Sequence, residues 1–137
     1  MELDLNTLNE ACKNTLAGHL GMKIIECTQD RVVATMPVDK TTHQPLGYLH
    51  GGASVALAET VASIGGWFYT AKDGKYVLGL EINANHLRSV REGHVKAIGT
   101  PIHIGKSTQV WEVKIHDEAG HLVSVSRCTL AVVGEKT

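Results

Sequence analysis

Cysteine is scarce in this 137-residue sequence, and its three copies, Cys12, Cys27 and Cys128, lie far apart. Their number is odd and no CxxC pair occurs, so the sequence indicates neither a disulfide framework nor a cysteine-ligated zinc site. Reduced thiols are typical of the cytoplasm, where we expect the protein to reside. Residues 1–6 lack the basic and long apolar segments of a signal peptide, which fits that location.

Other signatures are missing as well. The 13 basic and 14 acidic side chains give a net charge of -1, which argues against nucleic-acid binding through bulk charge. The eight histidines are scattered and no HExxH occurs, so we expect no metal site. A P-loop, a dinucleotide fingerprint and the GxSxG of serine esterases are absent. We therefore expect no nucleotide cofactor and no serine nucleophile.

A clean membrane-spanning run is also lacking. The nearest candidate, residues 51–71, is long enough to cross a bilayer. It is interrupted by the charged Glu59, by hydroxyl side chains such as Ser54 and Ser63, and by glycines. We expect this segment to be a buried helix of a globular core and the protein to have no membrane partner.

The apolar residues, 43% of the chain, suffice for one core, which predicts a single domain over residues 1–137. Apolar spacing predicts a short amphipathic helix over residues 5–20. Residues 39–49 have the composition of a loop. Short segments of strand character, separated by turns that mostly contain glycine, cover residues 22–28, 32–38, 76–87, 94–104, 108–116 and 122–133.

The order of elements predicts the fold. A helix that is apolar almost all round needs cover on more than one side. A curved antiparallel sheet wrapped around one long central helix provides that cover. The sequence therefore predicts an α+β protein with the hotdog fold.

Glu59 is the only charged side chain between His50 and Lys72. A carboxylate buried in an apolar helix is costly to desolvate unless it is paired or used in chemistry. Glu59 is therefore a candidate acid, base or nucleophile. The alternative is a structural glutamate whose hydrogen bonds are satisfied.

The turn before this helix offers a complementary group, because the backbone N–H of Gly51 can face a ligand as an oxyanion donor. Glu59 follows Gly51 by eight positions, or roughly 12 Å along a helix. Groups that act on one carbonyl must converge to roughly 3 Å of the reacting atoms. One helix cannot bring them together, whereas two antiparallel helices across a two-fold axis can. If both groups work together, the protein is at least a dimer.

Three neighbours are ambiguous. Ser63 lies one helical turn after Glu59, where it either holds a water or permits close helix packing. Gln44 either donates its amide to a carbonyl or is an exposed loop residue. His50 is more typical of a partner for local backbone than of a base.

Basic residues fall near the predicted strand ends and turns. Arg88, Arg91, Lys96 and Lys106 either gather around an anionic ligand or are separate surface charges. The amides of residues 105–107 are candidates for binding a phosphate.

Several segments resemble the hotdog-fold acyl-CoA thioesterases: Met36–Asp39, Thr42–Gly47, Leu49–Ser54, Leu57–Thr60, Gly79–His86 and Gln109–Trp111. The resemblance runs from about Leu8 to Val133. It is strongest to the bacterial enzymes that hydrolyse 1,4-dihydroxy-2-naphthoyl-CoA in menaquinone synthesis. The proofreading thioesterases of enterobactin synthesis are also similar.

The resemblance implies a role for each site residue. Glu59 is expected to act as nucleophile or general base, and the Gly51 N–H of the other subunit to polarise the thioester carbonyl. His50 and Gln44 are expected nearby, and Ser63 is expected to place the hydrolytic water. Residues expected to contact coenzyme A, itself part of the substrate, are Gly79, His86, Leu87, Arg88, Ser89, His103, Ile104, Gly105, Lys106, Ser107 and Thr108. The family also implies a homotetramer built as a dimer of dimers.

The sequence departs from close relatives at Leu46 and Tyr48, both expected near the acyl pocket, and in the turn at residues 106–108. We expect hydrolysis of an aromatic acyl-CoA such as 1,4-dihydroxy-2-naphthoyl-CoA. Hydrolysis of a mischarged acyl or aryl carrier protein is the alternative within enzymes. A non-catalytic acyl-CoA-binding module would not need Glu59, and a hotdog dehydratase would need a differently placed histidine and acidic residue.

Overall fold

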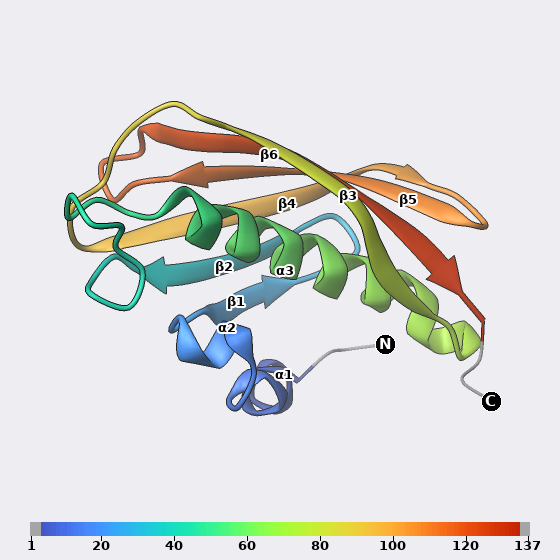
Figure 1. The fold of residues 1–137 in the computed structure, drawn as a ribbon. Coiled ribbons are helices and arrows are strands. Elements are labelled where there is room, and N and C mark those ends of the chain that lie inside the picture. The colour runs from blue at the N-terminus through green and yellow to red at the C-terminus, as the bar shows by residue number, and fades with distance from the viewer. Residues whose placement is uncertain (1–3, 135–137) are drawn as a thin grey trace.

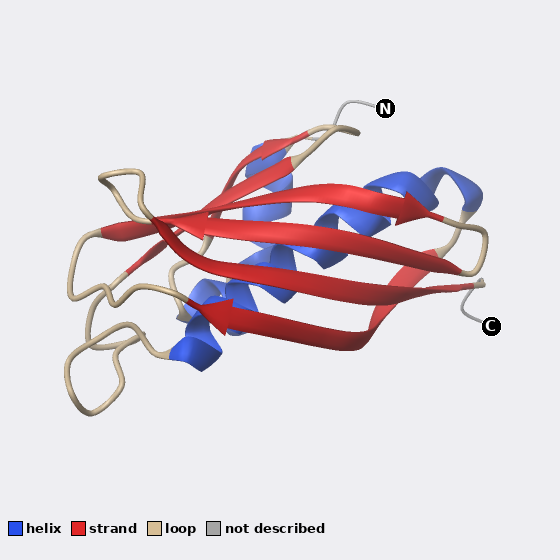
Figure 2. Ribbon diagram, turned by 90° about the horizontal axis from the view of Figure 1, so that it is seen from above, coloured by secondary structure: helices blue, strands red, loops and turns tan. Residues whose placement is uncertain are grey.

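The computed structural model describes residues 4–134 and contains one six-stranded antiparallel sheet. The strands are β1 (Lys23–Cys27), β2 (Val32–Pro37), β3 (Tyr76–His86), β4 (His94–Ile104), β5 (Thr108–His116) and β6 (Leu122–Val133), in the spatial order β1-β2-β4-β5-β6-β3. Helix α3 (Gly51–Thr70) lies across one face of the curved sheet (Figure 1). Viewed from above, the strands run over the length of this helix (Figure 2). The predicted hotdog fold is confirmed.

Both ends of helix α3 have clear boundary signals. The ring Nδ1 of His50 accepts a hydrogen bond of 2.8 Å from the Gly52 N–H, which caps the helix start. At the other end, a single 3₁₀ turn, η1 (Ala71–Asp73), leads to Gly74, whose φ of 68° favours glycine. The predicted long helix is thus confirmed with nearly the same bounds.

Two glycines let this helix approach the sheet closely. A Cβ on Gly65 would lie 2.4 Å from the Trp111 ring, and one on Gly66 would lie 2.7 Å from a Leu130 methyl group. Trp111 is fully buried, and its indole N–H donates to Gln109 Oε1 over 2.9 Å. Any larger residue at 65 or 66 would push the helix off the sheet, because a packed core has no spare volume.

Helix α3 packs against all six strands of the curved sheet and against α2, but this cover is incomplete. Its sheet-facing residues are buried, namely Ala53, Ser54, Leu57, Ala58, Val61, Ala62, Gly65, Gly66 and Thr70. The remaining strip is half-buried at Glu59 and Ser63, and Trp67 is 38% exposed. The curved sheet therefore provides the predicted cover for most of the helix, and one strip of the helix surface stays open in the single chain. Among residues 4–134, no helix combines the length and the apolar character needed to span a membrane.

The predicted helix over residues 5–20 is interrupted. Helix α1 (Leu5–Cys12) ends before Thr15, and α2 (Leu16–His19) begins after it. The two pieces pack tightly where they turn, because a Cβ on Gly18 would lie 2.1 Å from the Lys13 carbonyl oxygen. This tertiary contact, which periodicity cannot reveal, explains the break.

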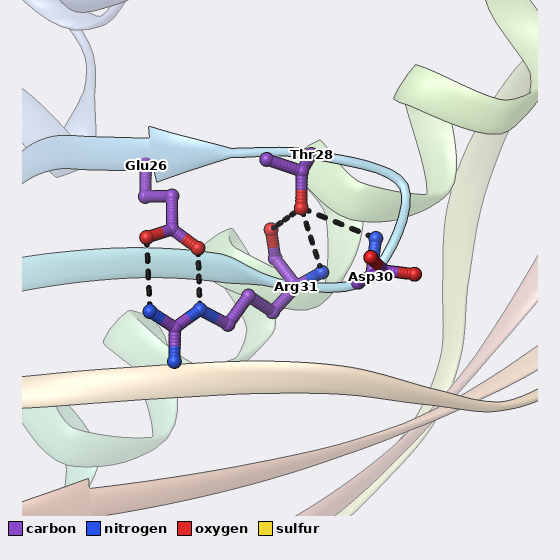
Figure 3. A network of polar contacts seen from close by, with 4 residues as sticks. All are labelled: Glu26, Thr28, Asp30 and Arg31. Carbon is purple, nitrogen blue, oxygen red and sulfur yellow. Dashed lines mark hydrogen bonds and ion pairs between the residues drawn. The ribbon is translucent and has the colours of Figure 1, made fainter.

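Strands β1 and β2, predicted over residues 22–28 and 32–38, form an antiparallel hairpin. Thr28 Oγ1 accepts hydrogen bonds of 3.2 Å from the Asp30 and Arg31 N–H groups (Figure 3). Arg31 and Glu26 form an ion pair across the hairpin, and this lowers the pKa of the Glu26 carboxyl. Such exposed pairs add little to stability, so the pair serves mainly to fix the turn.

Candidate active site

The two central candidates, Gly51 and Glu59, line separate hollows along helix α3. The first, the Gly51 pocket, has a volume of about 390 Å³ and is lined by Gln44, Tyr48, Gly51, Ser54 and residues 86–89 among others. The second, the Glu59 groove, has a volume of about 600 Å³. It runs between α2 and α3 and is lined by Cys12, Leu16, Val55, Glu59, Ser63 and Ile64 among others. The structure thus places the two central candidates, Gly51 and Glu59, in different hollows of one chain.

The Gly51 N–H is a donor without an acceptor. Among residues 4–134 it has no hydrogen-bond partner, whereas the next amide, that of Gly52, is bound by the His50 ring. Gly51 is also the first residue of a 20-residue helix, whose dipole gives this end partial positive charge. His50 therefore acts as a cap, as the sequence favoured, and leaves the Gly51 N–H available to an anionic oxygen.

Gln44 points one end of its amide toward local backbone. Its Oε1 accepts from the Leu46 N–H, which leaves the amide nitrogen as the end that can donate to a ligand in the Gly51 pocket. Leu46 itself is 75% exposed and does not line the Gly51 pocket, so its expected place near the acyl pocket stays a prediction.

Tyr48 does line the Gly51 pocket, and Arg91 holds it in place. The Arg91 guanidinium lies 4.5 Å from the ring centroid and also donates to the Tyr48 hydroxyl over 2.8 Å. Nε2 of His43 contacts the Arg91 carbonyl oxygen at 2.7 Å, which ties the loop before α3 to the segment after β3. The loop over residues 39–49 is therefore fastened at the pocket wall.

Glu59 lies in the middle of α3 and faces strand β3. It is half-buried, so the deep burial expected from the sequence is wrong for the single chain. Among residues 4–134, its carboxylate has no hydrogen bond and no ion pair. One of its oxygens rests against Gly79, where an added Cβ would lie 2.4 Å from Oε2. Ser63, one turn later, lines the same groove.

Cys128 lies on the sheet beneath Glu59 and was not singled out as a site residue. Burial, followed by the charges of Glu59 and Glu81, raises the pKa of its thiol to about 12. The thiol is therefore neutral at physiological pH. No spacing in the sequence marks this residue, because its place depends on the pairing of β6 with β3.

The segments expected to bind coenzyme A do not meet within one chain. Residues 86–89 follow the end of β3, where His86 pairs with Ser124 of β6. Residues 103–108 surround the β4–β5 turn, where Thr108 pairs with Ala131. Ser124 and Ala131 are seven positions apart on β6, or roughly 23 Å. The single chain therefore separates two groups of residues that the sequence predicted to share one ligand.

Each segment has its own local arrangement. Arg88 lies 3.6 Å from Asp117, and His86 packs against the Gly51 turn, with its Nε2 at 3.0 Å from where a Gly51 Cβ would be. At the β4–β5 turn the Gly105 N–H donates to the Thr108 carbonyl over 2.8 Å. Lys106 and Ser107 are exposed there and free to meet a polar ligand. No cluster of three or more His, Cys, Asp or Glu placed for a metal occurs among residues 4–134.

Comparison with known proteins agrees with this geometry. The model of the thioesterase superfamily matches residues 46–124, a stretch that contains both Gly51 and Glu59. The chain belongs to the thioesterase superfamily. It is 46% identical to the 1,4-dihydroxy-2-naphthoyl-CoA hydrolase of Escherichia coli over 132 residues, or 96% of each chain. The proofreading thioesterase EntH of Cronobacter turicensis is equally similar, with 46% identity and the same coverage.

Solved structures of thioesterases show the same fold. A Haemophilus influenzae thioesterase has a TM-score of 0.93 and 49% identity, covering 98% of this chain and 93% of its own. A Staphylococcus aureus thioesterase with a glutamine-to-alanine change has a TM-score of 0.83 and 42% identity, covering 86% and 98%. A glutamate-to-alanine variant of that protein matches with a TM-score of 0.83 and 44% identity, covering 85% and 97%. The protein is thus a hotdog-fold thioesterase.

Proposed function

We propose that a dimer of this chain hydrolyses aromatic acyl-CoA thioesters, with each active site built from both subunits. One observation carries the proposal. The Gly51 N–H and the Glu59 carboxylate both lack a partner among residues 4–134, yet they open onto different hollows. Only a second copy can bring them to one carbonyl.

The surface of the chain supports such a pairing. Strand β3 is an edge of the sheet, and Leu78 and Leu80 on it are 54% and 61% exposed. The open face of α3 with Trp67 is adjacent to this edge, so one partner can cover both. Apolar side chains and unpaired backbone on an edge strand favour association with another copy. Two antiparallel α3 helices then place Gly51 of one chain beside Glu59 of its partner, and two such dimers form the tetramer.

The proposed reaction uses each group once. The thioester oxygen accepts hydrogen bonds from the Gly51 N–H and the Gln44 amide, which stabilise its developing negative charge. Glu59 either attacks the carbonyl carbon or takes a proton from a water that attacks it, and Ser63 holds that water. If Glu59 attacks, loss of the thiolate leaves an anhydride between the acyl group and Glu59, and water then hydrolyses it to the free acid and the restored carboxylate. If water attacks, the carbon–sulfur bond breaks to give the free acid directly. In both cases the thiolate takes up a proton and leaves as coenzyme A.

The same pairing accounts for coenzyme A. In an antiparallel dimer, residues 86–89 of one chain approach residues 103–108 of its partner. Arg88 and Lys106 then supply positive charge for the phosphates, and the exposed amides of the β4–β5 turn supply donors. Coenzyme A is bound as part of the substrate in this scheme.

An apolar hollow of about 490 Å³ between α1 and α3 supports an aromatic acyl group. We call it the Trp67 hollow; it is lined by Leu8, Ala11, Ile64 and Trp67 and, at its polar positions, by Asp4, Thr7 and Ser63. Ser63 and Ile64 also line the Glu59 groove, so the two hollows are adjacent. An acyl group held there lies directly next to the carboxylate, and 1,4-dihydroxy-2-naphthoyl-CoA is the proposed example.

The variant structures of the Staphylococcus aureus relative lend further support to Gln44 and Glu59. The altered glutamine and glutamate are separated in that chain by the same number of residues as Gln44 and Glu59 here. A glutamine and a glutamate at this spacing fit the roles proposed here for Gln44 as an amide donor and Glu59 as a catalytic carboxylate.

The proposal is tested by thiol release from aromatic, short aliphatic and long aliphatic acyl-CoAs, with Glu59→Gln measured beside the wild type. Rapid hydrolysis of aromatic acyl-CoA that falls by at least about a thousandfold in Glu59→Gln supports the proposal. Near-normal turnover by Glu59→Gln contradicts it. Turnover of aryl carrier protein alone, with none of the acyl-CoAs cleaved, would assign the protein to proofreading instead.

A further inference from the structure

Gly79 occupies an unusual place in strand β3. It faces the helix, because its partner on β6 is Leu130, a fully buried residue that packs against α3. A Cβ added at this position would lie 2.4 Å from Glu59 Oε2 and 3.3 Å from Glu59 Cδ, with no other heavy atom within 4 Å. Real Cβ atoms do not approach another atom to 2.4 Å. The carboxylate therefore occupies the space that any side chain at position 79 would need.

A bulge in β3 produces this arrangement. Gly79 pairs with Leu130 and Glu81 pairs with Thr129, so Leu80 is an extra residue that pairs with no residue of β6. Beyond the bulge, Ile82 pairs with the buried Cys128 and also faces the helix. A bulge re-aims the side chains of an edge strand. Here it turns a glycine toward the middle of α3, and leaves Leu80 61% exposed.

Glu59 is held by shape instead of by hydrogen bonds. Its carboxylate has no hydrogen-bond or ion-pair partner among residues 4–134, and Cys128 lies close by on the sheet. With Gly79 against one of its oxygens, the carboxylate opens onto the Glu59 groove.

We propose that Gly79 is a positioning residue, whose missing side chain sets the conformation of Glu59 and so the place of the carboxylate at the thioester. This inference rests on the catalytic role proposed for Glu59. It differs from the role that family resemblance gives Gly79, which is contact with coenzyme A. The two roles predict different kinetic effects of a substitution at Gly79. A residue that positions Glu59 affects the chemical step and so kcat, whereas a residue that contacts coenzyme A affects binding and so KM.

The test is Gly79→Ala assayed with an aromatic acyl-CoA. The added methyl group forces the carboxylate to move by the order of 1 Å, and such a misplacement of a reacting group costs about a hundredfold in rate. We expect kcat to fall by about 10- to 100-fold with KM within about twofold of the wild type. A raised KM with unchanged kcat would overturn the positioning role of Gly79 and favour its contact with coenzyme A.

A second variant separates positioning from damage to the strand. Glu59→Asp shortens the side chain by one methylene and withdraws the carboxylate from position 79. We expect the double variant Gly79→Ala with Glu59→Asp to lose at least about tenfold less activity than the product of the two single losses. Strictly multiplicative losses would contradict a direct contact.

The control is Gly134→Ala, since a Cβ there meets no atom of residues 4–134 within 4 Å. It should leave kcat, KM and the melting temperature unchanged. Glu59→Gln in the same assay keeps the two proposals apart. An active Glu59→Gln overturns the proposed function itself. An inactive Glu59→Gln beside a fully active Gly79→Ala overturns only the positioning role of Gly79.

Discussion

The two faces of helix α3 differ in what they contact, and the difference separates stability from catalysis. The sheet-facing side is filled with small and apolar residues such as Leu57 and Val61, both fully buried. The side that borders edge strand β3 and the Glu59 groove carries Glu59 and Ser63, half-buried, and the exposed Trp67. One helix therefore anchors the core and presents the reactive groups. Substitutions on the two faces should have different consequences.

The largest expected effect is on the sheet-facing side. Leu57→Ala removes a fully buried side chain and leaves a cavity, which should lower the free energy of unfolding by about 2–5 kcal/mol. Urea unfolding measures this change, and kcat per folded molecule should stay close to wild type. Thr60→Ala, on the open face, is the matched control and should change stability by less than about 0.5 kcal/mol. Equal losses in the two variants would remove the contrast between the faces.

Gly51→Pro tests the helix start without altering either face. Proline is well tolerated as the first residue of a helix but has no N–H to donate. We expect kcat to fall by about 10²- to 10³-fold with the melting temperature nearly unchanged. Gly51→Ala keeps the N–H and should retain most of the activity. If the alanine variant is as impaired as the proline variant, crowding near His86 explains the loss and the donor does not.

Trp67→Ala sharpens the role of the open face. Removing the indole from the Trp67 hollow should lower kcat/KM for aromatic acyl-CoA by about tenfold or more, while acetyl-CoA turnover stays unchanged. Parallel assays with the two substrates give kcat/KM for each, and the ratio of these values measures selectivity for the aromatic acyl group. A uniform loss for both substrates would show that Trp67 stabilises the fold or the dimer without selecting the acyl group.

The smallest expected effect concerns Cys128, which lies where the two faces meet. Its pKa is raised from an ordinary 9.0 to about 12, so the folded protein holds this proton more tightly than the unfolded chain. The contribution to stability is complete below about pH 9 and is lost as the pH rises toward 12. Urea unfolding at pH 8 and at about pH 10.5 should show a smaller loss in Cys128→Ala than in the wild type. Identical losses in both proteins would contradict the assignment.

Most of the fold could be predicted because its signals are local. Alternation of Trp111, Val113 and Ile115 with polar residues marks β5, and all three are fully buried. The turn signals placed every strand limit within one residue of its observed position. The break between α1 and α2 escaped prediction because it depends on Gly18 meeting a carbonyl five residues earlier in a folded pair.

The site was predictable in part. Glu59, Gly51 and the capping His50 could be found from the sequence, because a lone charge and a turn before an apolar helix are visible there. The sequence could not predict three other features: the half-buried state of Glu59, its contact with Gly79, and the separation of residues 86–89 from 103–108. They depend on the register of β3 against β6, including one extra residue at Leu80.

A mixing experiment tests the shared active site most directly. Glu59→Gln and Gly51→Pro are each inactive as pure dimers, and they are unfolded together, refolded together and assayed. If each site takes Gly51 from one chain and Glu59 from the other, every mixed dimer has one intact site. Random mixing then restores about one quarter of wild-type activity. If both groups act within one chain, every site in the mixture stays defective, and an inactive mixture containing verified mixed dimers would contradict the shared site.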